Sequence, residues 1–192
     1  MTLQSSGTIR WSEIRDEFGA NIGGTGVSLG RYRNSDSNFG NKNVGTLTNL
    51  PLDIGVPMSG TISASSFYSK RLNMVLDMYS GGTEFRVHCR TRYNDSSKVK
   101  VVGNYRSRPT NVSGTRVIVN INKTFGSEEG THITTCAVKT GDWNPTTDLD
   151  LEIGSNGKIY GAGGDGGDGG SANGSGGQNG KSGSTGLGVQ YP

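Results

Sequence analysis

The sequence contains few apolar residues, and hydrophobic side chains make up only 30% of its 192 residues. No apolar run approaches the roughly 20 residues that a membrane-spanning helix needs. The N-terminus also lacks the basic and then apolar stretches of a secretory signal peptide. We therefore expect a protein that is made in a cytoplasm, is not exported by a cleaved signal and does not insert into a membrane.

The chain has only two cysteines, Cys89 and Cys136, too few for a disulfide framework. Each lies in a strand-like run beside apolar residues, which predicts buried, reduced thiols. A zinc site would need more ligands, since only His132 lies close to Cys136 and neither a CxxC nor an HxxxH motif accompanies them. We expect no metal and no cofactor.

Strong charge of either sign is also lacking, because the net charge is +3. Lysine and arginine are scattered along the chain and not clustered, which argues against nucleic acid as the partner. A nucleic-acid-binding protein with a disordered glycine tail stays open as an alternative, and salt-dependent DNA binding would test it.

Glycine is abundant near the C-terminus, where it fills half of positions 161–188. Such a segment cannot build an ordinary apolar core. It is either a flexible linker or an ordered array of polyproline-II-type strands, which have three residues per turn and accept glycine where backbones approach closely.

A three-residue period in this segment favours the ordered structure. The first leg places glycine in two registers, which contain Gly161, Gly164, Gly167 and Gly170 and also Gly163, Gly166 and Gly169. After residues 171–173 the phase changes, and the second leg repeats glycine at Gly174, Gly177, Gly180, Gly183 and Gly186. A turn between two packed legs would produce this change. The packing predicts that Gly166, Gly169, Gly177 and Gly180 face a neighbouring backbone.

A short motif occurs twice in the N-terminal third of the chain. Ser6-Gly7-Thr8-Ile9 and Ser59-Gly60-Thr61-Ile62 are each followed by a serine and an apolar pair. Each copy predicts an extended hook and one helical turn, the first over residues 13–18 with Ser12 as its N-cap. Such small elements bury little alone, so each should dock on a partner subunit or on the other copy. Residues 34–49 between them predict a surface loop or arm.

Residues 72–160 alternate apolar and polar side chains with period two, which predicts β-strands. The expected strands cover residues 72–78, 85–89, 99–101, 117–121, 133–139, 148–153 and 158–160, and Asn156-Gly157 predicts a hairpin. We expect an all-β fold, an antiparallel β-sandwich over residues 71–160. Residues 1–70 form an N-terminal attachment region with the two hooks and the arm, and residues 161–192 form a glycine-rich tail.

Acidic residues give two candidate sites, each with a simpler explanation. Asp148, Asp150 and Glu152 could supply a glycosidase carboxylate pair, but they alternate with leucine and isoleucine and so predict a solvated strand face. Asp165 and Asp168 are spaced as in calcium-binding glycine repeats, yet the apolar residue that those repeats need is missing.

Basic residues and histidines give no catalytic pattern either. Arg86, Arg90 and Arg92 with Tyr93 predict a basic strand face, which could bind an anionic glycan or nucleic acid but is also what a solvent-exposed face contains. His88 and His132 lack a nearby Ser/Asp or Cys arrangement of the kind that catalysis needs, and a lone histidine on a strand face is usually structural. We assign no catalytic, cofactor-binding or metal-binding residue and expect no enzyme activity.

Three segments together resemble tail proteins of tailed bacteriophages. Residues 153–170 are similar to the junction of a strand with polyglycine, residues 59–70 to a recurrent hook, and residues 3–9 to the start of such proteins. The family includes tail-tip and fibre-tip adhesins with packed polyglycine-II helices. Those adhesins carry several glycine legs, whereas this chain has enough for about two, which favours completion by other subunits.

The resemblance implies a structural component of the virion tail, at a fibre or the tail tip, that serves in host attachment or as an adaptor. Its partners would be other tail proteins and a host surface receptor, and glycine legs from about three chains would make a homotrimer. A tail-associated surface-glycan hydrolase is the alternative.

Overall fold

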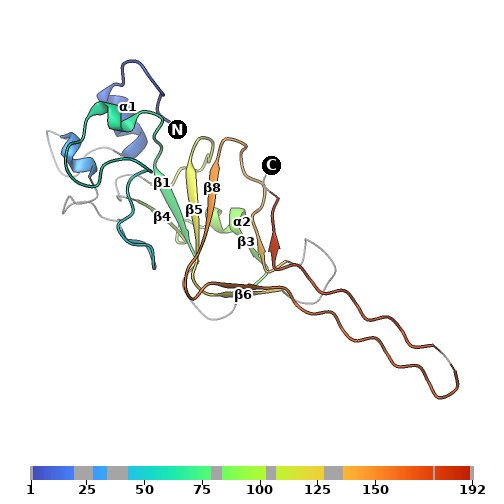
Figure 1. Cartoon of the computed structure of the whole chain (residues 1–192). Helices are drawn as coiled ribbons and strands as arrows, with labels where there is room; N and C mark the ends of the chain where they lie inside the picture. The colour runs from blue at the N-terminus through green and yellow to red at the C-terminus, as the bar shows by residue number, and fades with distance from the viewer. Residues whose placement is uncertain are drawn as a thin grey trace.

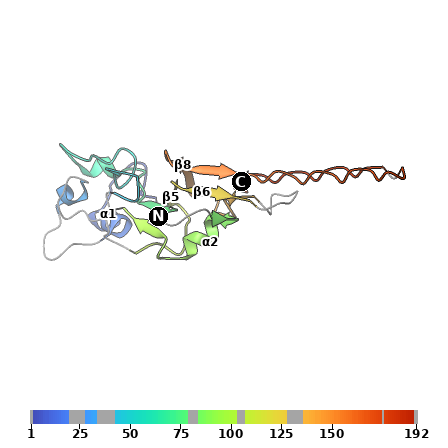
Figure 2. The same cartoon turned by 90° about the horizontal axis from the view of Figure 1, so that it is seen from below.

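In the computed structural model, the structure describes residues 2–19, 28–33, 43–78, 84–102, 107–127, 136–174 and 176–190. An N-terminal region packs at one end of a β-rich body, and a long narrow ribbon leaves the other end (Figures 1 and 2). Most of the predicted arm and His132 lie outside the described residues.

The body is built from three small sheets around one hydrophobic core. The strands are β1 (Asn73–Asp77), β2 (Glu84–Phe85), β3 (Val87–His88), β4 (Val99–Val101), β5 (Arg116–Ile121), β6 (Thr124–Gly126), β7 (Val138–Lys139), β8 (Asp148–Ile153), β9 (Lys158–Tyr160) and β10 (Leu187–Gly188). Their orders are β4-β1-β5-β8, β2-β6-β9 and β10-β7-β3.

The chain visits the three sheets three times in the same order. The first pass supplies β1, β2 and β3, the second β5, β6 and β7, and the third β8, β9 and β10. Each strand lies parallel to its equivalent in the next pass. The body is therefore a short parallel coil of three turns, like a β-helix.

The expected β-rich fold is confirmed, but the antiparallel sandwich is not. Among the described strands, only β1 and β4 pair in the antiparallel sense. Period-two alternation shows which side chains point inward and says nothing about the direction of the neighbouring strand. The long connections that separate β1, β5 and β8 allow the chain to return to the same edge and pair in parallel.

The hairpin predicted at Asn156-Gly157 is also wrong. A turn does form, with the Gly157 amide donating to the Gly154 carbonyl over 2.8 Å. However, β8 pairs with β5 while β9 pairs with β6. The turn therefore carries the chain from one sheet into the next and does not fold it back.

Two short α-helices flank the first pass of the body. Helix α1 (Trp11–Phe18) agrees with the predicted helix, but its N-cap is Arg10 and not Ser12, and the Glu13 carboxylate accepts from the Arg10 amide at 2.5 Å. Helix α2 (Cys89–Asn94) replaces the end of the strand predicted over residues 85–89. Neither is long and apolar enough to cross a membrane, nor is any other helix in the described ranges.

The two hook copies have equivalent local structures. Both glycines, Gly7 and Gly60, have positive φ angles of 88° and 74°. The N-cap residue is extended in both copies, Arg10 in the first and Ser63 in the second. The N-cap amide donates to the side chain three residues later, Glu13 or Ser66. The next residue, Ile14 or Phe67, is apolar and buried. The second copy forms the 3-10 helix η2 (Ala64–Phe67).

The hooks pack against one another, the second of the two possibilities that the sequence left open. The Leu3 amide donates to the Lys70 carbonyl and the Ser69 amide to the Gln4 carbonyl, over 2.8 and 3.0 Å. Phe18 and Phe67 lie 5.4 Å apart between ring centroids.

The 3-10 helix η1 (Leu29–Tyr32) supplies a third ring, Tyr32, to this aromatic cluster. Burial raises the pKa of Tyr32 to about 12.

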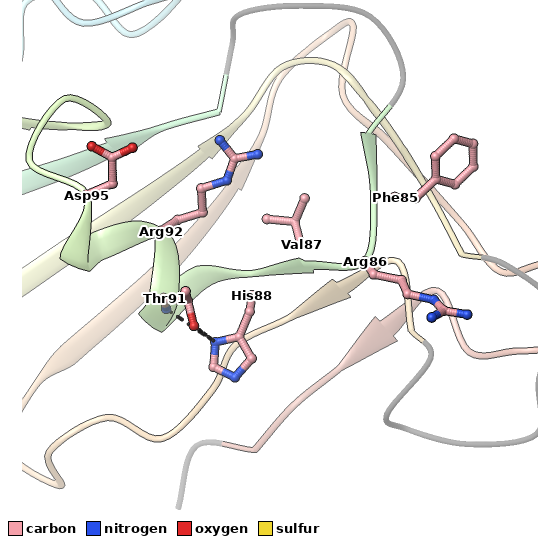
Figure 3. A pocket seen from close by; sticks show the side chains of 7 residues that line it. All are labelled: Phe85, Arg86, Val87, His88, Thr91, Arg92 and Asp95. Carbon is pink, nitrogen blue, oxygen red and sulfur yellow. Dashed lines mark hydrogen bonds between the residues drawn. The ribbon is translucent and has the colours of Figure 1, made fainter.

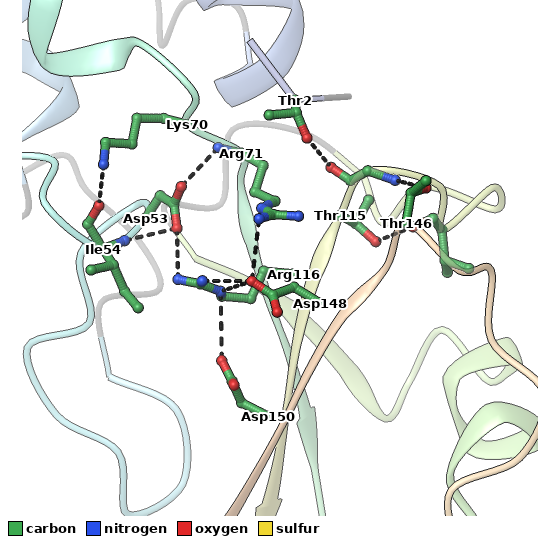
Figure 4. A network of polar contacts seen from close by, with 12 residues as sticks. Thr2, Asp53, Ile54, Lys70, Arg71, Thr115, Arg116, Thr146, Asp148 and Asp150 are labelled. Atoms are coloured by element: carbon green, nitrogen blue, oxygen red, sulfur yellow. Dashed lines mark hydrogen bonds and ion pairs between the residues drawn. The ribbon is translucent and has the colours of Figure 1, made fainter. Parts of the chain in front are cut away.

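A charge network joins the N-terminal region to the body (Figure 4). Arg116, at the start of β5, lies 3.1 Å from a carboxylate oxygen of buried Asp53, 2.6 Å from Asp148 and 3.5 Å from Asp150. Arg71 adds a second contact to Asp148 at 3.2 Å. The network fixes the segment around Asp53 to the ends of β5 and β8.

Candidate functional site

The ribbon is the most distinctive feature of the molecule, and it is inserted between β9 and β10. Two extended legs run side by side away from the body and are joined by a turn at residues 171–174 (Figures 1 and 2). The amides of Gln178, Lys181 and Ser184 donate to the carbonyls of Asp168, Asp165 and Ala162 over 2.8–2.9 Å. Hydrogen bonds therefore recur at every third residue, which is not the pattern of a β-ladder.

Glycine is required in the registers where the legs face each other. A Cβ atom on Gly164 or Gly167 would overlap a carbonyl oxygen of the second leg. A Cβ atom on Gly177 would lie 2.9 Å from the Asp168 carbonyl oxygen, and one on Gly180 would lie 2.7 Å from that of Asp165. These distances leave no room for any side chain, so the legs can approach this closely only through glycine.

One predicted register is wrong. Gly166 and Gly169, together with Gly163, have nothing within 4 Å of the position of a Cβ atom. The first leg faces its neighbour through the other glycine register, that of Gly164 and Gly167. Both registers of the first leg contain glycine at every step, so its own sequence did not distinguish them.

The base of the ribbon is bonded into two of the sheets. The Ala162 amide donates to the hydroxyl oxygens of Ser127 and Ser184, each over 2.8 Å. On the other side, the Val138 amide donates to the Gly186 carbonyl over 3.0 Å. Both legs thus start from fixed positions, and the ribbon is anchored as a continuation of the body.

Three of the candidate acidic residues pair with cationic side chains of the chain itself. Asp165 on the first leg accepts from the Lys181 ammonium at 2.8 Å. Asp148 and Asp150 belong to the Arg116 network, and Glu152 is exposed. Within the described ranges, no group of three or more His, Cys, Asp or Glu side chains could hold a metal ion.

The basic strand face that the sequence predicted is not formed. Arg86 lies at a corner between two sheets, whereas Arg90 and Arg92 lie on α2. The Arg90 guanidinium stacks on Tyr93 and Trp143, 5.6 and 5.4 Å from the ring centroids. Arg92 pairs with Glu84. In Figure 3, Arg86 and Arg92 extend to opposite sides of Val87.

The cysteines and the remaining histidine are structural. Cys89 and Cys136 are buried, reduced thiols, as predicted, and burial raises the pKa of the Cys89 thiol to about 12. Burial, together with the charge of Lys139, lowers the pKa of His88. Its Nδ1 atom accepts from the Thr91 amide over 3.3 Å, which holds the ring as a cap on α2.

An exposed aromatic residue was missed by the sequence analysis. The alternation placed Phe85 on the same face as Val87 and Cys89, yet Phe85 is 56% exposed and the other two are buried. Arg86 has a φ angle of 53° and interrupts the strand between them. No signal in the sequence marked this break, because a left-handed backbone is rare for residues other than glycine.

The C-terminal part of the chain matches a known protein family. The family described as phage tail fibre adhesin Gp38 matches residues 88–192, more than half of the chain. The match begins within β3 and includes the ribbon and both strands that anchor it. No curated protein and no solved structure matches the chain. The chain belongs to the Gp38 family of phage tail fibre adhesins and is a component of a virion tail.

Proposed function

We propose that this protein attaches a phage to its host from the end of a tail fibre, with the N-terminal region on the fibre side and the ribbon on the host side. The observation that carries the proposal is the position of the ribbon. It projects from the end of the body opposite the N-terminal region (Figure 2), and it lies within the part of the chain that matches the adhesin family.

The ribbon would act as a pair of polyglycine-II legs. Hydrogen bonding at every third residue and glycine in the facing registers support this conformation. At about 3.1 Å per residue, a leg of ten residues reaches roughly 30 Å. A stiff extension of this length would place the turn at residues 171–174 well ahead of the body.

The fibre side would use exposed apolar side chains of the N-terminal region. Ile54 is 62% exposed and Met58 is 38% exposed, and both lie in the segment just before the second hook. Exposed apolar patches mark protein contacts, whereas single exposed apolar residues are common, and here two of them lie four residues apart in one segment. Ile14 and Phe18 are buried, so removal of residues 1–20 would damage the core as well as any fibre contact.

The experiment compares phage particles that carry Ile54→Asp and Met58→Asp together with particles that carry Val189→Asp. All three side chains are exposed, so the purified variants should keep the melting temperature of the wild type. We expect the double variant to be absent from purified tails, and the Val189→Asp protein to be present. A separate ribbon variant that lacks residues 165–181 should enter tails but fail to adsorb to host cells. Normal adsorption of that variant would refute the host-side role of the ribbon.

A further inference from the structure

Two exposed aromatic side chains lie in one row on the outer face of the β2-β6-β9 sheet. Phe85 pairs with Gly126, and Gly126 pairs with Tyr160. Residues paired in register point to the same face of a sheet. Phe85 and Tyr160 are 56% and 52% exposed, whereas Phe125, in the adjacent row, is fully buried. The outer row therefore presents two aromatic rings on either side of a glycine.

Gly126 lets the Phe85 ring lie down on the sheet. A Cβ atom at Gly126 would lie 3.0 Å from the Cε1 atom of Phe85, so any other residue there would push the ring outward. One edge of the ring lies over Gly126, and more than half of the side chain stays exposed to solvent.

Arg86 brings a positive charge to the same side of the chain. In a regular strand, successive side chains point to opposite faces. The left-handed backbone of Arg86, with a φ angle of 53°, breaks that alternation, and in Figure 3 Phe85 and Arg86 extend to the same side. Glycine would adopt this backbone without strain, so an arginine here indicates a role for the guanidinium.

A cavity of about 420 Å³ opens at this corner, within the range of roughly 300–1,000 Å³ found for small-ligand pockets. Residues of β2, β3 and α2 line it, and the guanidinium groups of Arg86 and Arg92 extend to opposite sides of Val87 (Figure 3). The lining residues are Phe85, Arg86, Val87, His88, Thr91, Arg92 and Asp95.

We propose that this corner binds an acidic saccharide of the host surface. The C–H face of a pyranose ring packs well on an aromatic face, which carries partial negative charge. A carboxylate or phosphate group on the sugar is the anion that a guanidinium binds best, through two parallel hydrogen bonds. Phe85 and Tyr160 would hold sugar rings, and Arg86 would select the anion.

The site lies at the base of the ribbon, because β9 and β10 are members of the same two sheets as β2 and β3. Tyr160 is the last residue of β9, directly before the first leg. The inference rests on the proposed function, since it names a class of receptor for an adhesin. It adds a contact on the body that is separate from the ribbon.

The test is calorimetric titration of the full chain with trigalacturonate, with a phosphorylated galactose oligosaccharide and with neutral galactotriose. We expect both anionic sugars, or one of them, to bind at least tenfold more tightly than the neutral sugar. Binding of only the uronate or only the phosphate would identify the anion. Equal binding of all three sugars, or binding of none, would overturn the proposal.

Variants locate the site. Phe85→Ala and Tyr160→Ala should each weaken anionic-sugar binding at least tenfold, and Ile153→Ala, at an equally exposed apolar residue of β8, should not. Arg86→Gly should remove the preference for the anionic sugar while leaving the melting temperature equal or higher. Wild-type affinity in Phe85→Ala or Arg86→Gly would refute the site. If these variants lose sugar binding but still adsorb normally to the host, the site binds sugar and is not required for attachment.

Discussion

Adjacent glycines in the first leg of the ribbon have different surroundings. Gly164 lies against the Lys181 carbonyl, whereas nothing lies within 4 Å of a Cβ atom placed on Gly163. The two residues are adjacent in sequence and both are exposed to solvent. Substitution of each by alanine therefore tests whether glycine is needed for packing between the legs or only for a glycine-rich composition.

We predict that Gly164→Ala separates the legs and Gly163→Ala does not. Alanine at an unstrained open position lowers the entropy of the unfolded chain and stabilises by up to about 1 kcal/mol, so Gly163→Ala should be neutral or favourable. Hydrogen exchange of the Lys181 amide, which donates to the Asp165 carbonyl, reports on the contact. Exchange should accelerate only in Gly164→Ala. Equal exchange rates in the two variants would contradict the packed legs.

The sequence predicted these contacts only in part. In the second leg a single register is glycine throughout, and Gly177 and Gly180 were predicted correctly. In the first leg two registers are glycine, and the choice between them depends on the phase of the opposite leg. That phase is set by the turn at residues 171–174 and by the hydrogen bonds at the base of the ribbon. A three-residue period in the sequence gives no information about either.

At the scale of elements, Glu84 connects β2 to two neighbouring segments. Its carboxylate pairs with Lys123 at 2.9 Å, at the start of β6, and with Arg92 on α2. Although burial disfavours the charge, the hydrogen bonds from Lys123 and Arg92 lower the pKa of Glu84 below its ordinary value. A depressed carboxyl pKa contributes stability above the unfolded-state pKa of about 4.3, and this stability is lost as the pH falls through the folded-state pKa.

We predict that Glu84→Gln reduces the acid sensitivity of the protein. Because Glu84 is partly exposed but its partner Lys123 is buried, the effect at pH 7 should be about 1–3 kcal/mol. Urea unfolding of both proteins from pH 7 down to pH 3 measures it. The difference in unfolding free energy should shrink as the pH falls below about 4, and a constant difference would rule out a contribution from the charge of Glu84.

The Arg116 network predicts a larger effect, because Arg116 is mostly buried and contacts three carboxylates. Arg116→Met would leave buried Asp53 without the guanidinium and should cost about 3 kcal/mol. Asp150→Asn removes a half-exposed partner at 3.5 Å and should cost less than about 1 kcal/mol. Chemical denaturation compares the two, and similar losses would show that the network is not what joins the N-terminal region to the body.

Most elements were predictable from the sequence, whereas their partners were not. The segments that became β1, β4, β5, β8 and β9 show apolar alternation or β-branched runs, and the structure places strands there. Parallel pairing depends on long connections that return the chain to the same edge, and local patterns carry no record of that return. Helix α2 was missed because residues 85–89 alternate apolar and polar side chains, which predicted one continuous strand. In the structure, Arg86 divides this segment into β2 and β3, and α2 begins at Cys89.

At the scale of the whole molecule, the ribbon leaves many backbone groups exposed. The described bonds between its legs use one amide in three of the second leg, and the register of Gly163, Gly166 and Gly169 is open. If legs from further copies pack on this open register, they bury these groups and must also supply their hydrogen-bond partners. We predict a homotrimer, measured by light scattering at micromolar concentration and in isolated tails. A monomer under both conditions would contradict it.

Because the ribbon is inserted between β9 and β10, its length can change without a change in the stability of the body. Both ends are held by the sheets, so a longer or shorter ribbon leaves every strand pair in place. The bonds between legs recur every three residues, however, so a change in length preserves the register only when each leg gains or loses a full triplet. Such a chain can alter its reach only in increments of roughly 9 Å. Related adhesins should therefore differ in ribbon length by multiples of six residues.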